Sequence, residues 1–99
     1  MADDDRLLKA RTDGSRAQSL LNDEVLQGAF AELKRAYAEK LLSTKSDQTA
    51  AREILYQAHR LVGEVENHLQ SLIGNGKLAD RELEHMITQR DPKKRWSII

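Results

Sequence analysis

The chain has 99 residues, of which 39% are apolar and 32% charged, and its formal net charge is zero. A chain of this length forms one domain at most and leaves little stability to spare, so we expect it to need a partner. It contains no run of the roughly 20 apolar residues that cross a bilayer, and its start lacks the basic and apolar regions of a secretory signal. We therefore expect a cytoplasmic protein that does not bind membranes. The absence of cysteine excludes disulfides and thiolate metal sites.

The first predicted segment, residues 1–14, is a flexible charged arm with at most one helical turn. It mixes acidic and basic side chains and offers only Leu7 and Leu8 to a core. From residue 15 the apolar spacing becomes helical and predicts a short helix over 15–21. Asn22 or Asp23 can then cap the start of the next helix.

Two long amphipathic helices are predicted next. Apolar residues recur at steps of three and four over 23–43 and again over 51–73, which places them on one face of each helix. The polar stretch 43–47 interrupts this stripe, and Ser46 or Asp47 can cap the second helix. The hairpin core or interface is expected to comprise Leu26, Phe30, Leu33, Tyr37, Leu41, Ile54, Leu55, Leu61, Val65, Leu69 and Leu72.

The second long helix is predicted to end at Gly74, Asn75 and Gly76, because these residue types favour the left-handed conformation that terminates helices. A last short helix begins at Leu78 and must end before Pro92. The predicted fold is therefore all-α, a long antiparallel helical hairpin flanked by short N- and C-terminal helices, with its helical domain over 15–88. Two helices make a thin core, so either the short helices complete a bundle or the exposed side of the hairpin is an oligomer interface.

Residue patterns that could carry catalysis or metal binding are weak in this chain. Glu82 and His85 share a helix face, but a di-iron bundle needs this pair twice together with further inward glutamates. Glu64 and His68 are explained more simply as a surface ion pair. The stretch GNGKL at 74–78 lacks the spacing and the Ser or Thr of a phosphate loop. We therefore expect no enzyme activity, no cofactor and no metal.

The C-terminal segment RDPKKRWSII, residues 90–99, is the remaining sequence feature that could indicate a function. Residues 89–99 are predicted to form a basic-aromatic tail. It combines a basic triplet with an apolar tip: Lys93, Lys94, Arg95, Trp96, Ile98 and Ile99. A frayed end with solubilising charge is one interpretation. The other is a peptide that docks on a protein surface, because tryptophan and arginine are typical interface anchors.

The chain resembles a group of small helical proteins encoded beside the head and packaging genes of tailed bacteriophages and prophages. The resemblance is carried by the basic-aromatic end and by two stretches, LLNDEVLQGAFAELKRAYAEKLLST and REILYQAHRLVGEVENHLQSLIGNGKLADRELE. The resemblance spans residues 16–96 and is one of pattern and layout. It implies a role in virion assembly, as a subunit repeated around a portal, head or packaging complex, or as an accessory assembly factor. The location would then be the host cytoplasm or the virion. No functional residue is carried over from the resemblance.

Three function classes follow from these observations. The first is a structural or assembly protein that binds copies of itself, or a phage head or portal component, through helix packing and the docking tail. The second is a DNA-binding small packaging subunit that grips phosphates with Arg6, Lys9, Arg11, Arg16 and the tail cations. The third is a small inhibitor of one host protein. The first is favoured, because nearby aspartates balance the cations of the arm and no helix-turn-helix signature is visible.

Overall fold

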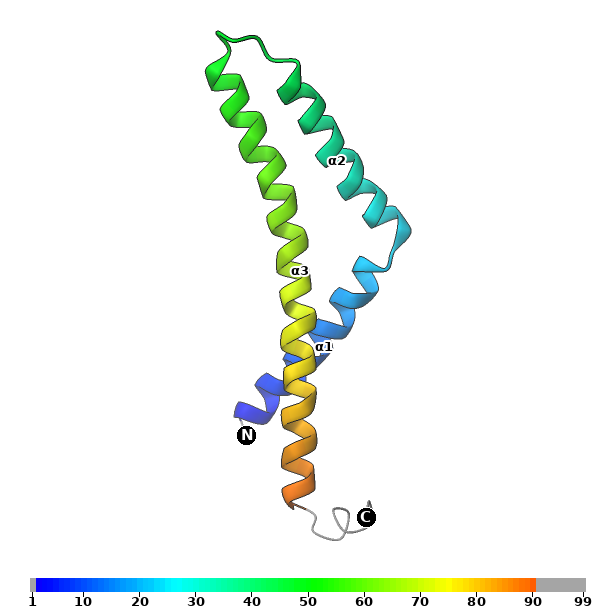
Figure 1. Ribbon diagram of the computed structural model, residues 1–99. Coiled ribbons are helices and arrows are strands. Elements are labelled where there is room, and N and C mark those ends of the chain that lie inside the picture. Colours follow the sequence, from blue (N-terminus) through cyan, green and yellow to red (C-terminus); the bar gives the residue numbers. More distant parts are fainter. Residues whose placement is uncertain (1, 91–99) are drawn as a thin grey trace. The chain divides into compact units, whose positions relative to one another are not determined.

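The computed structural model describes residues 2–90, and these residues form three helices and no strand. The helices are α1 (Ala2–Leu21), α2 (Glu24–Leu42) and α3 (Thr49–Arg90) (Figure 1). The prediction of an all-α chain is confirmed. None of the described helices has the length and apolarity that a bilayer crossing requires.

The chain divides into two compact units, and α3 contributes to both. Among the described residues, the crossing unit contains residues 2–18 and 70–90. The groove unit is Ser19–Leu69. The two units are described separately below.

Helix α1 runs through the segment that was predicted to be a flexible arm, so that prediction is wrong for residues 2–14. Three aspartates occupy its first turn, where negative charge is favourable beside the positive end of the helix dipole. The Lys9 ammonium donates to the Asp13 carboxylate at 2.6 Å, an i, i+4 pair that supports the helix. In addition, Gly14 and Ala17 are buried. Helix α1 therefore has a packed face, which the many charged residues of its sequence do not suggest.

Helix α2 begins where the sequence indicated. Asp23 is its N-cap, with extended backbone dihedrals, and its carboxylate accepts a hydrogen bond from the Leu26 amide at 3.0 Å. This bond satisfies one of the amides that the first turn of a helix leaves without a partner. The capping role predicted for Asp23 is confirmed.

Removing this cap should weaken the start of α2. We expect Asp23→Ala to lower the stability of the groove unit by about 1 kcal/mol, because a cap carboxylate contributes this much and alanine cannot accept the hydrogen bond. Asp23→Asn should retain most of the stability, since its side-chain oxygen can still accept. Urea unfolding followed by circular dichroism measures both variants, and equal losses for the two would contradict the capping role.

The turn between α2 and α3 covers residues 43–48. Helix α3 starts at Thr49, so Gln48, and not Ser46 or Asp47, stands at the capping position. The Arg52 guanidinium reaches back to the Lys45 carbonyl at 2.6 Å. This bond joins the first turn of α3 to the loop.

Helix α3 continues through Gly74, Asn75 and Gly76, so the predicted helix end and the separate short helix after it are both wrong. No glycine among the described residues has a positive φ angle. Glycine in a helix interior costs about 1 kcal/mol relative to alanine. At Gly76 this cost is offset by close packing with α1, which a side chain would prevent.

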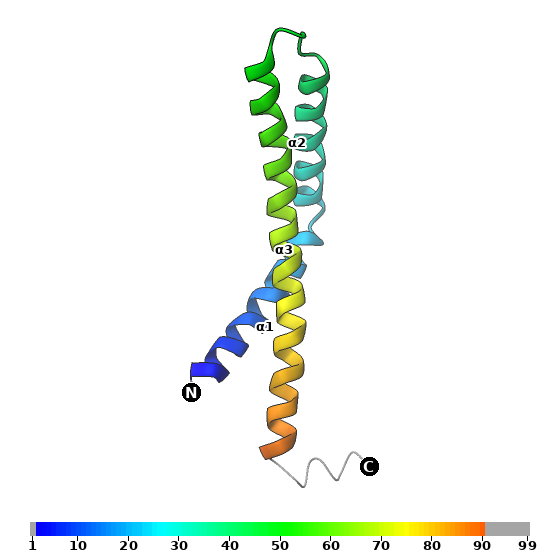
Figure 2. The same ribbon diagram turned by 60° about the vertical axis from the view of Figure 1, so that its left-hand side comes forward.

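The buried core lies in the crossing unit, where α1 crosses the C-terminal half of α3 (Figures 1 and 2). A Cβ atom built on Gly14 would lie 2.8 Å from the Leu72 carbonyl oxygen and 2.9 Å from the Gly76 Cα. One built on Gly76 would lie 3.0 Å from the Gly14 Cα and 3.1 Å from the Ala10 carbonyl oxygen. The two helices therefore meet backbone to backbone, surrounded by the buried apolar side chains of Ala17, Ile73, Ala79 and Leu83.

The groove unit is packed much less deeply. Both views show α2 beside the N-terminal half of α3 (Figures 1 and 2), and the Lys34 ammonium lies 2.8 Å from the Glu66 carboxylate. Nevertheless α2 contains no buried residue. Most of its apolar stripe is only partly removed from water by α3, so the unit leaves part of its hydrophobic stabilisation unrealised.

Candidate interaction surface

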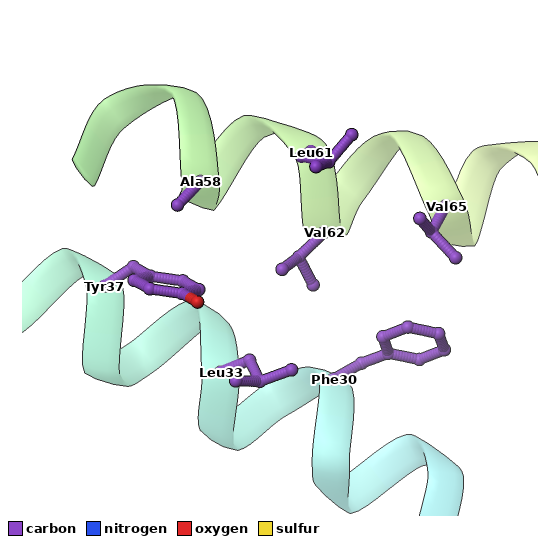
Figure 3. Close-up of a pocket in the computed structure, with 7 residues that line it drawn as sticks. All are labelled: Phe30, Leu33, Tyr37, Ala58, Leu61, Val62 and Val65. Carbon is purple, nitrogen blue, oxygen red and sulfur yellow. The ribbon is translucent and has the colours of Figure 1, made fainter. Parts of the chain in front are cut away.

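A groove of about 250 Å³ runs between α2 and α3. Figure 3 shows the Val62 side chain pointing toward α2. All the side chains that line the groove are apolar or aromatic: Phe30, Leu33, Tyr37, Ala58, Leu61, Val62 and Val65. Such a lining can bind another apolar surface but offers no charged group for catalysis or ion binding.

The residues predicted for the hairpin core or interface divide into two sets, and none is buried. The half-buried set comprises Leu26, Phe30, Tyr37, Leu41, Leu55, Leu69 and Leu72. The exposed set comprises Leu33 (44% exposed), Val65 (46%), Leu61 (60%) and Ile54 (70%). The exposed set is the more informative, because large apolar side chains that remain in contact with water together mark an interaction surface.

One side of the α2–α3 pair is closed by polar side chains. We define the closed flank by Lys34, His59 and Glu66, all half-buried. The Lys34–Glu66 ion pair bridges the two helices on this flank. Because this ion pair is partly exposed, its contribution to stability is about 0–1 kcal/mol. It nevertheless places charge on this side of the two helices.

The other side of the pair mixes apolar and charged side chains. A helix turns by about 100° per residue, so Leu61 and Glu66 lie on opposite edges of the stripe that faces α2. The same spacing places Ile54 beside Leu61, and places Ala29 and Ala36 on the edge of α2 opposite Lys34. We define the open flank by Ala29, Ala36, Ile54 and Leu61; the same spacing places the exposed Glu32 between Ala29 and Ala36, and Lys40 one turn beyond Ala36.

The histidine and glutamate pairs considered for metal binding lie on helix surfaces. Glu64 is engaged by Arg60 at 3.1 Å. Glu82 and His85 are exposed and border a shallow depression on α3. Within residues 2–90, no three His, Asp or Glu side chains gather closely enough to hold a metal ion.

The cations proposed for phosphate binding lie on α1, where three of them face carboxylates. Arg6 lies 3.9 Å from Asp3 and Arg11 lies 3.6 Å from Asp80, while Lys9 is bound to Asp13. Arg16 is exposed. The tail residues Lys93, Lys94, Arg95, Trp96, Ile98 and Ile99 lie outside the described residues.

The sequence-based prediction missed several residues that the structure brings into contact. Gly14 and Gly76 were assigned to an arm and to a helix end, although each lies at the tightest contact of the crossing unit. One sequence feature could have identified this contact: Ala10, Gly14 and Ala17 are spaced at steps of four and three, which forms a stripe of small residues on one helix face. Such a stripe allows two helix backbones to approach closely.

Comparison of the chain with protein-family models, with curated proteins and with solved structures finds no match.

Proposed function

We propose that the protein is a non-enzymatic assembly protein that associates with copies of itself through the groove unit, arranged as an antiparallel helical hairpin. The observation that carries this proposal is the exposure of the apolar stripe: α2 buries no residue, and Leu33, Leu61 and Val65 on the groove remain exposed. Covering these side chains gains about 25 cal/mol for each Å² of apolar surface. Self-association supplies that cover without requiring another protein.

The charge distribution supports protein association over nucleic-acid binding. Formal net charge is zero, so copies of the chain do not repel one another through a net field. Three of the α1 cations face carboxylates, which reduces their availability to phosphates. The wider setting, assembly of a phage virion with residues 93–99 docking on a neighbouring subunit, is proposed from the sequence pattern alone.

Light scattering on a sizing column, across a concentration series of the full chain, tests the proposal. We expect a discrete mass larger than the 11.3 kDa of one chain, and a thermal midpoint that rises with protein concentration because association stabilises the folded state. The mass of a single chain at every concentration would contradict self-association.

A further inference from the structure

The pair Asn75 and Gly76 lies in α3 where this helix contacts α1. The Asn75 side chain is exposed, whereas Gly76 is buried. Of the three asparagines in the chain, only Asn75 is followed by glycine. This order matters chemically, because the backbone nitrogen that follows an asparagine can attack its side-chain amide. The nitrogen of a glycine is the least hindered, since glycine has no side chain.

The reaction that this pair allows is deamidation. The Gly76 nitrogen forms a bond to the side-chain carbonyl carbon of Asn75, and the bond from that carbon to the amide nitrogen breaks. The proton that the Gly76 nitrogen gives up balances the proton that the leaving nitrogen takes up to become ammonia. Water then opens the five-membered succinimide ring at either carbonyl, which leaves aspartate or isoaspartate at position 75. One water is consumed, and no oxidant is needed.

The helical backbone opposes this attack. Helix α3 is continuous through Asn75 and Gly76, and in an α-helix the amide of residue 76 donates its hydrogen to the carbonyl of residue 72. Closing the ring also requires the ψ angle of Asn75 to leave the helical value of about −42°. The reaction must therefore wait until this turn of α3 unwinds, even though the Asn75 side chain is in contact with water.

The contact with α1 controls that unwinding. A Cβ atom built on Gly76 would lie 3.0 Å from the Gly14 Cα and 3.1 Å from the Ala10 carbonyl oxygen, so the two backbones leave no space for Gly76 to rotate. Unwinding α3 at this turn therefore requires that α1 move away. Such a local opening has its own free energy, set by the contacts that it breaks.

We propose that Asn75 is a site of spontaneous deamidation that reacts only when α1 separates from α3, and that its isoaspartate product prevents the contact from re-forming. In isoaspartate the chain continues through the side-chain carbon atoms, which adds one carbon atom to the backbone before Gly76. The added atom displaces Gly76 from its close contact with Gly14. The modification thus makes a transient opening of the crossing unit permanent.

The test follows deamidation of the full chain by mass spectrometry of its tryptic peptides, after incubation at mildly alkaline pH. Trypsin releases residues 61–77 as one peptide, which contains both Asn75 and Asn67. Asn67 is the internal control, because it is also exposed on α3 but is followed by His68. In urea we expect Asn75 to react faster than Asn67. In the folded chain Asn75 should react at least about tenfold more slowly than in urea.

Two variants that leave the Asn75 and Gly76 pair intact change the opening in opposite directions. Gly14→Ala places a methyl group 2.8 Å from the Leu72 carbonyl oxygen, and the rate in the folded chain should rise about fivefold to 30-fold, because it follows the opened fraction. At Gly74 a Cβ atom meets nothing within 4 Å, so Gly74→Ala stabilises the helix and should lower the rate about twofold to fivefold.

The result for Gly74→Ala keeps the test decisive if Gly14→Ala does not fold. An unchanged or increased rate in Gly74→Ala, or an unchanged rate in a folded Gly14→Ala, would overturn control by the crossing unit. Equal rates for Asn75 and Asn67 in urea would overturn the site itself.

The consequence of the reaction is measured on the modified chain, which ion exchange separates by its additional negative charge. Hydrogen exchange over residues 70–80 should lose its protection in the isoaspartate form and keep it in the aspartate form, because only isoaspartate lengthens the backbone. An isoaspartate form with the protection of the unmodified chain would show that the contact re-forms, and would overturn that part of the proposal.

Discussion

Replacing Gly14 by alanine is expected to destabilise the crossing unit by about 1–2 kcal/mol, although alanine is the better helix former. The added methyl group would lie 2.8 Å from the Leu72 carbonyl oxygen and 2.9 Å from the Gly76 Cα. Both are backbone atoms, so no rotamer change can relieve the contact and the two helices must separate. Overpacking of this kind costs about 1–3 kcal/mol, which exceeds the gain of roughly 1 kcal/mol from helix propensity.

The chain contains a matched control for this substitution. Gly74 lies on α3 two residues before Gly76, and a Cβ atom built there meets nothing within 4 Å. Gly74→Ala should therefore stabilise the protein by about 0.5–1 kcal/mol, since only the propensity term remains. Peptide-level hydrogen exchange over residues 70–80 measures both variants. If Gly14→Ala increased protection as Gly74→Ala does, the close crossing of α1 and α3 would be disproved.

Truncation of Leu83 is expected to have the larger effect. Leu83 is 9% exposed and belongs to the buried set of the crossing unit. Leucine-to-alanine changes at buried positions cost about 2–5 kcal/mol, through lost transfer energy and the cavity that remains. The described core is small, so neighbouring side chains can fill part of the cavity, and we expect a loss of roughly 2–3 kcal/mol.

Leu78 provides the control for this truncation on the same helix. It is 62% exposed, so Leu78→Ala should change stability by less than about 0.5 kcal/mol, as surface substitutions do. Thermal unfolding by circular dichroism, with urea titrations for the free energies, compares the two. Equal losses would mean that the C-terminal half of α3 does not pack against α1 through its Leu83 face.

Local patterns predicted the helices better than they predicted their ends. The steps of three and four over residues 23–43 and 51–73 are typical of amphipathic helices, and α2 and α3 cover these ranges apart from terminal residues. Asp23 was identified as a cap because a short carboxylate before an apolar stripe has one favoured local role. In both cases the information lies within a few residues of the feature.

The errors arose where a distant segment decides the local structure. Gly74 and Gly76 favour a helix end by propensity, but the packing of Gly76 against Gly14 favours a helix that passes through. Propensity differences of about 1 kcal/mol are overridden by tertiary contacts of larger size. For the same reason the charged N-terminal segment forms part of α1, since its small residues face α3.

The sequence by itself determined the helical class of the chain, the apolar faces of its long helices, the α2 cap and the absence of thiol chemistry. These properties follow from residue type and period, which act over one or two helical turns. Only the tertiary structure decided that the core lies where α1 crosses α3, and that the predicted stripe between α2 and α3 is left partly exposed. Burial depends on which surfaces meet, and that is set by contacts between residues far apart in the chain.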